Sequence, residues 1–120
     1  ILKNVGVAYI DLNGLKAIND NYGHSNGDKF ICTAADTFKM VFPDNSYRIG
    51  GDEFVIIEQN IERDKYEERI TALKNIMQDK QVSISIGVLW REQVDDLEAL
   101  LKSADKLMYM EKEMYHKNRE

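Results

Sequence analysis

The spacing of hydrophobic residues changes several times along the chain, and each change predicts a new element. Residues 5–10, VGVAYI, form an almost unbroken apolar run, which is typical of a central strand covered on both faces. Apolar residues at helical spacing predict a helix over 28–42, with Asp28 as its N-terminal cap and Pro43 just beyond its end. The segment 13–27 between them is rich in Asn and Gly, and it predicts a short helical turn followed by a loop.

The second half of the chain also alternates between the hydrophobic spacing of strands and that of helices. SYRI (46–49) and EFVII (53–57) read as two short strands joined through Gly-Gly-Asp, which is a hairpin signal. Helical spacing returns over 62–79, strict alternation over 82–90 predicts a half-buried strand, and a last helical stripe begins at Asp95. This order matches the split βαββαβ arrangement, an α+β ferredoxin-like fold with a mostly antiparallel central sheet and helices packed on it.

Three acidic side chains stand at the ends of the predicted strands. Asp11 follows the first strand, and Asp52 and Glu53 follow the second in the Gly-Gly-Asp turn. In the split arrangement the first and third strands are neighbours and the first two run parallel, so the topology brings the acids to one rim. Crowded carboxylates repel one another, and a divalent cation with oxygen ligands removes that repulsion. Two such ions support phosphoryl displacement, and Gly50 and Gly51 leave room for a bulky ligand. The alternative is a surface hairpin with solvated acids.

Composition narrows the class of protein. The chain has 120 residues, 43% apolar and 31% charged, which fits one globular domain. Its formal net charge of -5 argues against a general nucleic-acid binder, so a phosphate-rich ligand must bring cations or find local lysines. The single cysteine excludes an intramolecular disulfide and fits a reducing compartment such as the cytoplasm. No apolar run approaches the roughly 20 residues of a membrane span, so no membrane contact is expected from this domain.

Four motifs in the same order resemble those of GGDEF domains, the diguanylate cyclases that make cyclic di-GMP. RIGGDEF (48–54) resembles the family signature, and YIDLNGLKAINDNYGHSNGD (9–28) resembles the substrate-binding segment. VSISIG (82–87) resembles the penultimate strand, and SADKLMYMEK (103–112) resembles the final helix. The resemblance implies a palm fold similar to nucleotidyl cyclases and a single GGDEF domain over residues 1–120. It also implies that the family's usual N-terminal helix is missing.

The resemblance assigns the acids to catalysis with Mg²⁺ or Mn²⁺. Asp11 and Asp52 would be metal carboxylates, with the backbone carbonyl of Leu12 as a further ligand. Glu53 would either hold a second metal or help to deprotonate the attacking ribose 3'-hydroxyl. The implied reaction condenses two GTP molecules into cyclic di-GMP and releases two pyrophosphates.

The resemblance also implies a GTP site. Asn19 and Asp28 would read guanine, because a carboxylate accepts hydrogen bonds from the base N1–H and N2–H₂. The backbone around Gly14 and Leu15 would receive the terminal phosphates, and two lysines would balance their charge. The other residues of the implied site are Lys16, Gly51, Lys112 and Arg48. On the residues alone, a helix cap is the favoured interpretation of Asp28, and a phosphate contact and a structural ion pair are equally good interpretations of Arg48.

Three positions depart from the family pattern. VFPD (41–44) keeps Asp44 of the product-inhibition motif RxxD, but Val41 replaces its arginine, so no tight product binding is expected. His116 stands where a phosphate-contacting arginine is usual, which predicts a weaker hold on the triphosphate. Asn13 stands where many members carry a second acid.

The expected partners follow from the implied reaction. Each domain holds one GTP and the two 3'-hydroxyls attack each other's α-phosphates, so catalysis requires a homodimer. An upstream sensor domain in the full-length protein would set the pairing, and the full-length protein could also carry a membrane tether. The alternatives are a catalytically inactive GTP-binding GGDEF module and another palm-type nucleotidyl transferase.

Overall fold

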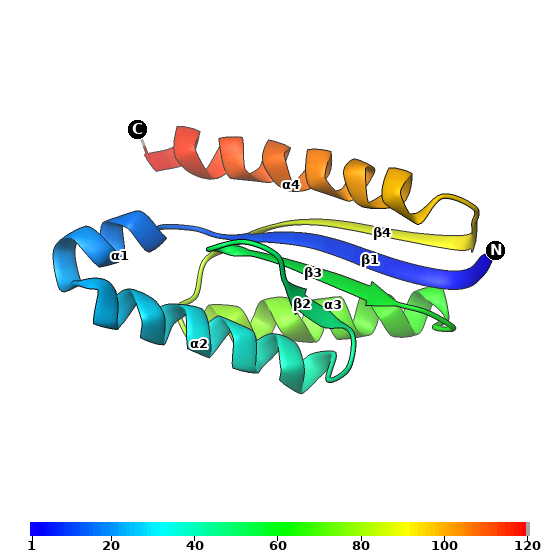
Figure 1. Cartoon of the computed structure of the whole chain (residues 1–120), viewed down its shortest axis with the longest axis horizontal. Helices are drawn as coiled ribbons and strands as arrows, with labels where there is room; N and C mark the ends of the chain where they lie inside the picture. Colours follow the sequence, from blue (N-terminus) through cyan, green and yellow to red (C-terminus); the bar gives the residue numbers. More distant parts are fainter. Residues whose placement is uncertain (120) are drawn as a thin grey trace.

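The computed structural model describes residues 1–119, which form a four-stranded sheet with helices on both faces (Figure 1). The elements are β1 (Leu2–Leu12), α1 (Leu15–Tyr22), α2 (His24–Val41), β2 (Ser46–Arg48), β3 (Glu53–Glu58), α3 (Arg63–Asp79), β4 (Ile84–Val94) and α4 (Leu97–Arg119). The strand order is β2-β3-β1-β4, and every neighbouring pair is antiparallel. The expected α+β ferredoxin-like palm fold is confirmed.

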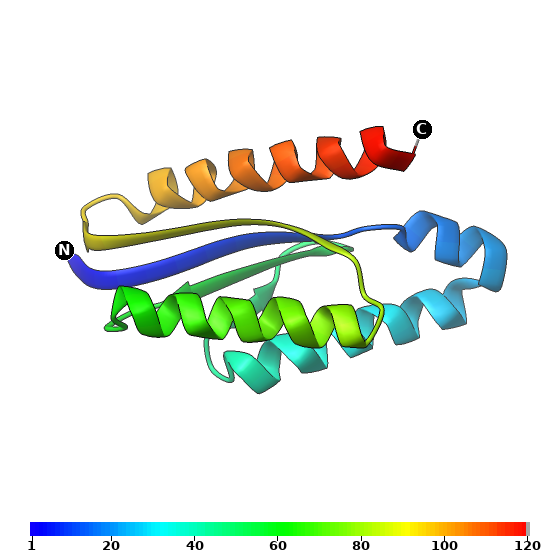
Figure 2. The ribbon, with the colours of Figure 1, turned by 180° about the vertical axis from the view of Figure 1, so that it is seen from behind.

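The alternating residues of β1 explain why both faces of the sheet are covered. Ala8, Ile10 and Leu12 belong to the core under α2 and α3, whereas Val5 and Val7 belong to the core under α4. Figures 1 and 2 show α4 on one side of the sheet and α2 and α3 on the other. A strand buried on both faces needs apolar residues at successive positions, which accounts for the unbroken run in the sequence.

Two predicted boundaries are each wrong by four residues. The expected loop before residue 28 is helical from His24 onward, because Gly23 takes a positive φ of 89° and turns the chain directly from α1 into α2. Asp28 therefore lies inside α2 and does not cap it. The last strand also continues past residue 90, to Val94, because it pairs with β1 as far as Leu2.

The pairing of the strands brings the acids together as expected. β1 and β2 are both antiparallel to β3, so they run in the same direction. Asp11 at the end of β1 is paired in register with Glu53 at the start of β3. The Leu12 N–H donates to the Asp52 carbonyl oxygen at 2.8 Å. These backbone contacts hold the Gly-Gly-Asp turn beside the end of β1.

Helix α4 packs unusually close to β4. A Cβ atom at Gly87 would lie 2.6 Å from the Met108 nitrogen and 2.9 Å from the Leu107 Cβ. The Ile86 N–H donates to Glu111 Oε1 of α4 at 3.2 Å. Both contacts hold the middle of α4 against the part of β4 that pairs with Tyr9 and Ile10 of β1. Within residues 1–119, no helix combines the length and the apolar character needed to cross a bilayer.

Candidate active site

The acids at the end of β1 have a positive partner within the chain. The ammonium of Lys112, on α4, lies 3.1 Å from Asp11 Oδ1, and the two side chains are 20% and 13% exposed. The same Nζ atom lies 3.4 Å from the Leu12 carbonyl oxygen and 3.5 Å from Asn13 Oδ1. Three consecutive residues of the chain therefore present oxygen atoms to one cation.

The three predicted acids share a rim, but their carboxylates do not form one ligand set. Glu53 pairs with Asp11 through the backbone, while its Oε1 lies 3.2 Å from the place of a Cβ on Gly50. Among the side chains that the structure describes, no three His, Cys, Asp or Glu residues gather closely enough to hold a metal ion. The Asp52 carboxylate interacts with that of Asp11, so these two carboxylates and the Leu12 carbonyl are the candidate ligands of one ion, while a metal role for Glu53 stays a prediction.

The electrostatics of Asp11 fit a cation site. Burial raises the pKa of Asp11, the nearby Asp52 carboxylate adds to the rise, and the Lys112 ammonium partly offsets it. Asp11 Oδ1 is also buried without a hydrogen bond of standard geometry among the described residues. Mg²⁺ typically uses one or two carboxylates and fills its remaining positions with other oxygens. The donor set at this rim fits such an ion.

A cavity of about 660 Å³ opens beside these oxygens, between α1, the turn at Asp52 and α4. This volume is typical of a small-molecule site. Six residues of the predicted site line the cavity: Leu12, Gly14, Leu15, Lys16, Asp52 and Lys112. His116 also lines it, as do three residues that the sequence did not single out, namely Ala17, Asp20 and Tyr115. Ala17 and Asp20 follow Gly14 at intervals of three residues, and this helical spacing could have predicted that they lie on the same side of α1 as Gly14.

The N-terminus of α1 faces this cavity. Gly14 takes a left-handed conformation, with φ of 80°, and its carbonyl accepts the first helical hydrogen bond, from the Ile18 N–H at 3.0 Å. The N–H groups of the first helical turn therefore have no partners within the helix. Because the helix dipole is positive at this end, the lining at Leu15 and Lys16 suits an anion such as phosphate.

Asn13 has a structural role beside the site. Its side chain is buried, Nδ2 donates to Ser83 Oγ at 3.1 Å, and Oδ1 accepts from Ser85 Oγ at 3.0 Å. The Asn13 N–H also donates to the Ser83 carbonyl at 2.9 Å. This network ties the end of β1 to the start of β4 and fixes the Asn13 oxygen that faces Lys112.

The sequence of this chain was compared with models of known protein families. The family model described as "Diguanylate cyclase, GGDEF domain" matches residues 2–118. The chain belongs to this family.

This chain matches one part of longer curated relatives. The signaling protein YkoW of Bacillus subtilis is 38% identical over 92% of this chain, which covers 15% of the relative. The diguanylate cyclase DgcS of Shewanella oneidensis is 34% identical over 91% of this chain, which covers 39% of the relative. Among solved structures, the GGDEF domain of TpbB (YfiN) from Pseudomonas aeruginosa is 27% identical, with a TM-score of 0.80. That match covers 93% of this chain and 73% of the solved one.

Two residues expected to read guanine lie outside the cavity of this GGDEF domain. The Asn19 side chain packs against Gly27 so closely that a Cβ there would lie 2.8 Å from Asn19 Cγ. Asp28 follows on α2 and is exposed. The two predicted guanine contacts therefore flank one edge, formed where α1 meets the start of α2.

The Gly-Gly turn of the signature is held by Arg48. Its Nε donates to the Gly50 carbonyl at 3.0 Å, and its Nη2 donates to the Gly51 carbonyl at 2.8 Å. Arg48 thus has a structural role, although its partners are carbonyls rather than the carboxylate of an ion pair. A Cβ at Gly51 would meet nothing within 4 Å, so the turn leaves open space on that side.

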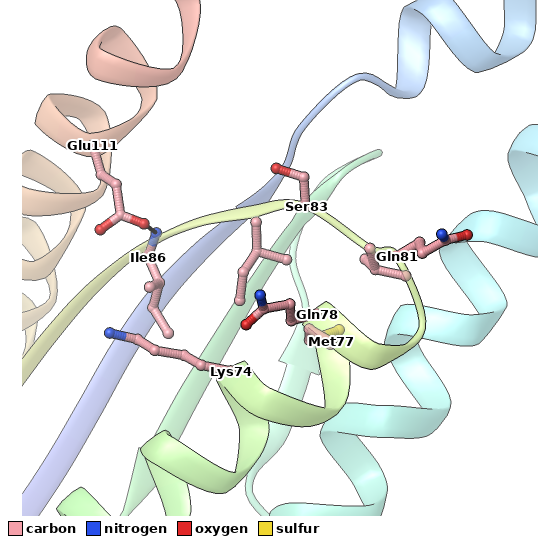
Figure 3. Close-up of a pocket in the computed structure, with 9 residues that line it drawn as sticks. Lys74, Met77, Gln78, Gln81, Ser83, Ile86 and Glu111 are labelled. Carbon is pink, nitrogen blue, oxygen red and sulfur yellow. Dashed lines mark hydrogen bonds between the residues drawn. The ribbon is translucent and has the colours of Figure 1, made fainter. Parts of the chain in front are cut away.

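A second cavity of the GGDEF domain, about 450 Å³, lies between α3, α4 and the start of β4. Figure 3 shows Lys74 and Gln78 of α3 opposite Glu111 of α4, with the hydrogen bond from Ile86 to Glu111 at its border. None of the predicted site residues lines it. The candidate active site is therefore the cavity at α1.

Proposed function

We propose that this GGDEF domain is a diguanylate cyclase that condenses two GTP molecules into cyclic di-GMP and two pyrophosphates. The observation that carries the proposal is the cavity in which Asp52, two lysines and the N-terminus of α1 meet beside the oxygens of Asp11 and Leu12. Anion-binding and cation-binding groups side by side suit a metal-bound nucleoside triphosphate.

The triphosphate binds at the base of α1. The backbone N–H groups around Gly14 and Leu15 receive its terminal phosphates, and the ammonium groups of Lys16 and Lys112 balance their charge. His116 lines the same cavity and, when neutral, adds only a hydrogen bond where an arginine would add a charge. These groups orient the α-phosphate toward the rim.

The carboxylates of Asp11 and Asp52 and the carbonyl of Leu12 would hold Mg²⁺ or Mn²⁺ at the rim. The bound ion would neutralise charge that develops on the phosphate oxygens. Glu53 would hold a second ion, or it would accept the proton of the 3'-hydroxyl as the hydroxyl oxygen attacks the α-phosphorus and the bond to pyrophosphate breaks. Gly51 gives the nucleotide open space beside the turn that Arg48 holds.

The base binds where α1 meets α2. Asn19 and Asp28 offer an amide and a carboxylate, which together accept from and donate to the guanine edge. Adenine lacks the N1–H and N2–H₂ donors that pair with the carboxylate. GTP is therefore preferred over ATP.

Catalysis requires two copies of the domain facing each other, because one cavity holds one GTP and each 3'-hydroxyl attacks the other nucleotide. The chain spans less than half the length of these curated relatives. The proposal includes an upstream sensor domain in the full-length protein, which would set the pairing. We place the domain in the cytoplasm, where GTP is available.

The test is an assay of the full-length protein with GTP and Mg²⁺ or Mn²⁺, with the nucleotides separated by chromatography. We expect cyclic di-GMP and two pyrophosphates for each product, at a rate that rises faster than linearly with protein concentration. Asp52→Asn should abolish product formation. Asp36→Asn, which removes an exposed carboxylate of α2 outside the cavity, should leave it unchanged.

Other results would identify the alternatives. Saturable GTP binding without turnover at high protein concentration would indicate an inactive regulatory module. A different product from GTP would indicate another palm-type nucleotidyl transferase. Equal turnover in Asp52→Asn would refute the assignment of the rim as the catalytic site.

A further inference from the structure

Lys112 lies between the metal ligands and the cavity. Its ammonium is within 3.5 Å of oxygens from Asp11, Leu12 and Asn13, and the same side chain lines the cavity with Lys16. One flexible lysine can therefore reach two different kinds of anion, the carboxylate at the rim or a phosphate in the cavity.

The oxygens around Lys112 are largely those proposed for the divalent ion. Asp11 and Leu12 supply two of the three candidate ligands, and both face the ammonium. Mg²⁺ sits about 2.0–2.1 Å from its oxygen ligands, so an ammonium cannot stay within hydrogen-bond distance of the same oxygens without severe repulsion. The two cations exclude each other at this site.

The ammonium is placed at the rim by the packing of α4, and its main contact there is the ion pair with Asp11. The hydrogen bond from the Ile86 N–H to Glu111 and the close approach at Gly87 fix the helix next to Lys112. The contact from Nζ to Asp11 Oδ1 is 3.1 Å, whereas those to the Leu12 carbonyl and Asn13 Oδ1 are longer, at 3.4 and 3.5 Å. The Asp11–Lys112 pair is largely buried, so removing the ammonium alone would leave an uncompensated carboxylate, and the ammonium leaves only when another cation takes its place beside Asp11.

We infer that Lys112 is an exchangeable internal counter-ion: it occupies the Asp11–Leu12 oxygens in the metal-free domain and leaves when the divalent ion binds. In the cavity it then meets the phosphates of the nucleotide. The inference rests on the proposed function for the identity of the metal ligands. Its consequence is that metal alone binds weakly, because it must displace a cation that has no other anion to receive it.

The test measures Mn²⁺ binding to the nucleotide-free chain by electron paramagnetic resonance of the free ion. We expect Lys112→Met to bind Mn²⁺ about tenfold or more tightly than the unmodified chain, because the competing charge at the ligands is gone. Lys16→Met is the matched control: it removes the same charge from the same cavity, but not from the Asp11 oxygens. It should change the affinity less than twofold.

The outcomes separate this inference from the proposed function. An equal gain in Lys112→Met and Lys16→Met would mean that only the overall charge of the cavity matters, which overturns the exchange. No gain in Lys112→Met, with Mn²⁺ binding still lost in Asp52→Asn, would overturn the exchange and leave the metal site standing. No Mn²⁺ binding in any variant, even with GTP, would overturn both.

A second measurement does not depend on the stability of a variant. Nuclear magnetic resonance of lysine side-chain ammonium groups in the unmodified chain should show the Lys112 signal moving to the position of a solvent-exposed lysine as Mg²⁺ is added. A Lys112 signal that stays in place while Mg²⁺ saturates the Asp11 site would refute the exchange.

Discussion

Gly87 decides how closely α4 approaches the sheet, and Gly87→Ala tests that approach. The new Cβ would lie 2.6 Å from the Met108 nitrogen and closer still to the Ala104 carbonyl oxygen. Relaxed contacts of carbon atoms lie near 3.5–4.0 Å, so α4 would have to move by about 1 Å or more. Both clashing atoms belong to the backbone of α4, so no change of rotamer can relieve them.

The expected loss of stability can be estimated from the usual effect of overpacking. An inserted methyl group that forces backbone shifts destabilises by roughly 1–3 kcal/mol. At about 3–5 °C per kcal/mol for a domain of this size, the melting temperature should fall by roughly 3–15 °C. Because Lys112 is carried on the same helix, the shift should also weaken its contact with Asp11.

Thermal unfolding followed by circular dichroism measures the effect. Gly51→Ala is the matched control, since its Cβ would meet nothing within 4 Å and its φ is not in the left-handed region. It should change the melting temperature by less than about 2 °C. Leu107→Ala should fail to rescue Gly87→Ala, because the backbone clashes remain. A melting temperature for Gly87→Ala within 2 °C of the unmodified chain would refute the close packing argued above.

Three further predictions concern the site itself. Asp52→Asn should stabilise the metal-free domain by about 0.5–1 kcal/mol at pH 7, because it removes a charge next to Asp11. The raised pKa of Asp11 means that its ionisation opposes folding above its ordinary value of 3.8, so this gain, measured as a difference in melting temperature, should shrink as the pH is lowered toward 4. His116→Arg should lower the KM for GTP several-fold with kcat little changed, as steady-state kinetics would show; a lower kcat with the same KM would speak against a phosphate contact. Calorimetry should find no submicromolar cyclic di-GMP binding at Asp44, because Val41 packs against the core and offers no fork of donors; tight binding lost in Asp44→Ala would contradict this.

Much of the fold and part of the site follow from local features of the chain. The unbroken run of β1, the alternation in β4 and the helical stripes each reflect which faces must be buried, so they predict the elements and their order. The convergence of Asp11 with the Gly-Gly-Asp turn follows in the same way, because the order of the elements leaves few topologies and this one places both at a single rim. The guanine, metal and catalytic roles stay predictions, since they concern ligands.

The start of α2 and the role of Arg48 show where local reasoning was insufficient. Asp28 is a residue type that often caps helices, but the turn at Gly23 starts α2 at His24, four residues before Asp28. Arg48 is long enough to reach a phosphate, an acid or a carbonyl, and only the shape of the turn selects the Gly50 and Gly51 carbonyls. When a side chain can reach several partners, the local geometry decides which of them it binds, and the residue type does not specify that geometry.

The sequence by itself determined the palm fold and the meeting of acidic residues at the end of β1, because burial periodicity and chain topology act through short stretches and element order. Only the tertiary structure decided which cation faces those acids. Lys112 lies 100 positions away from Leu12, and it reaches the rim because Gly87 and Glu111 fix α4 against the sheet. A contact between elements that are distant in the sequence depends on how their side chains and backbones pack, and a local sequence pattern does not specify that packing.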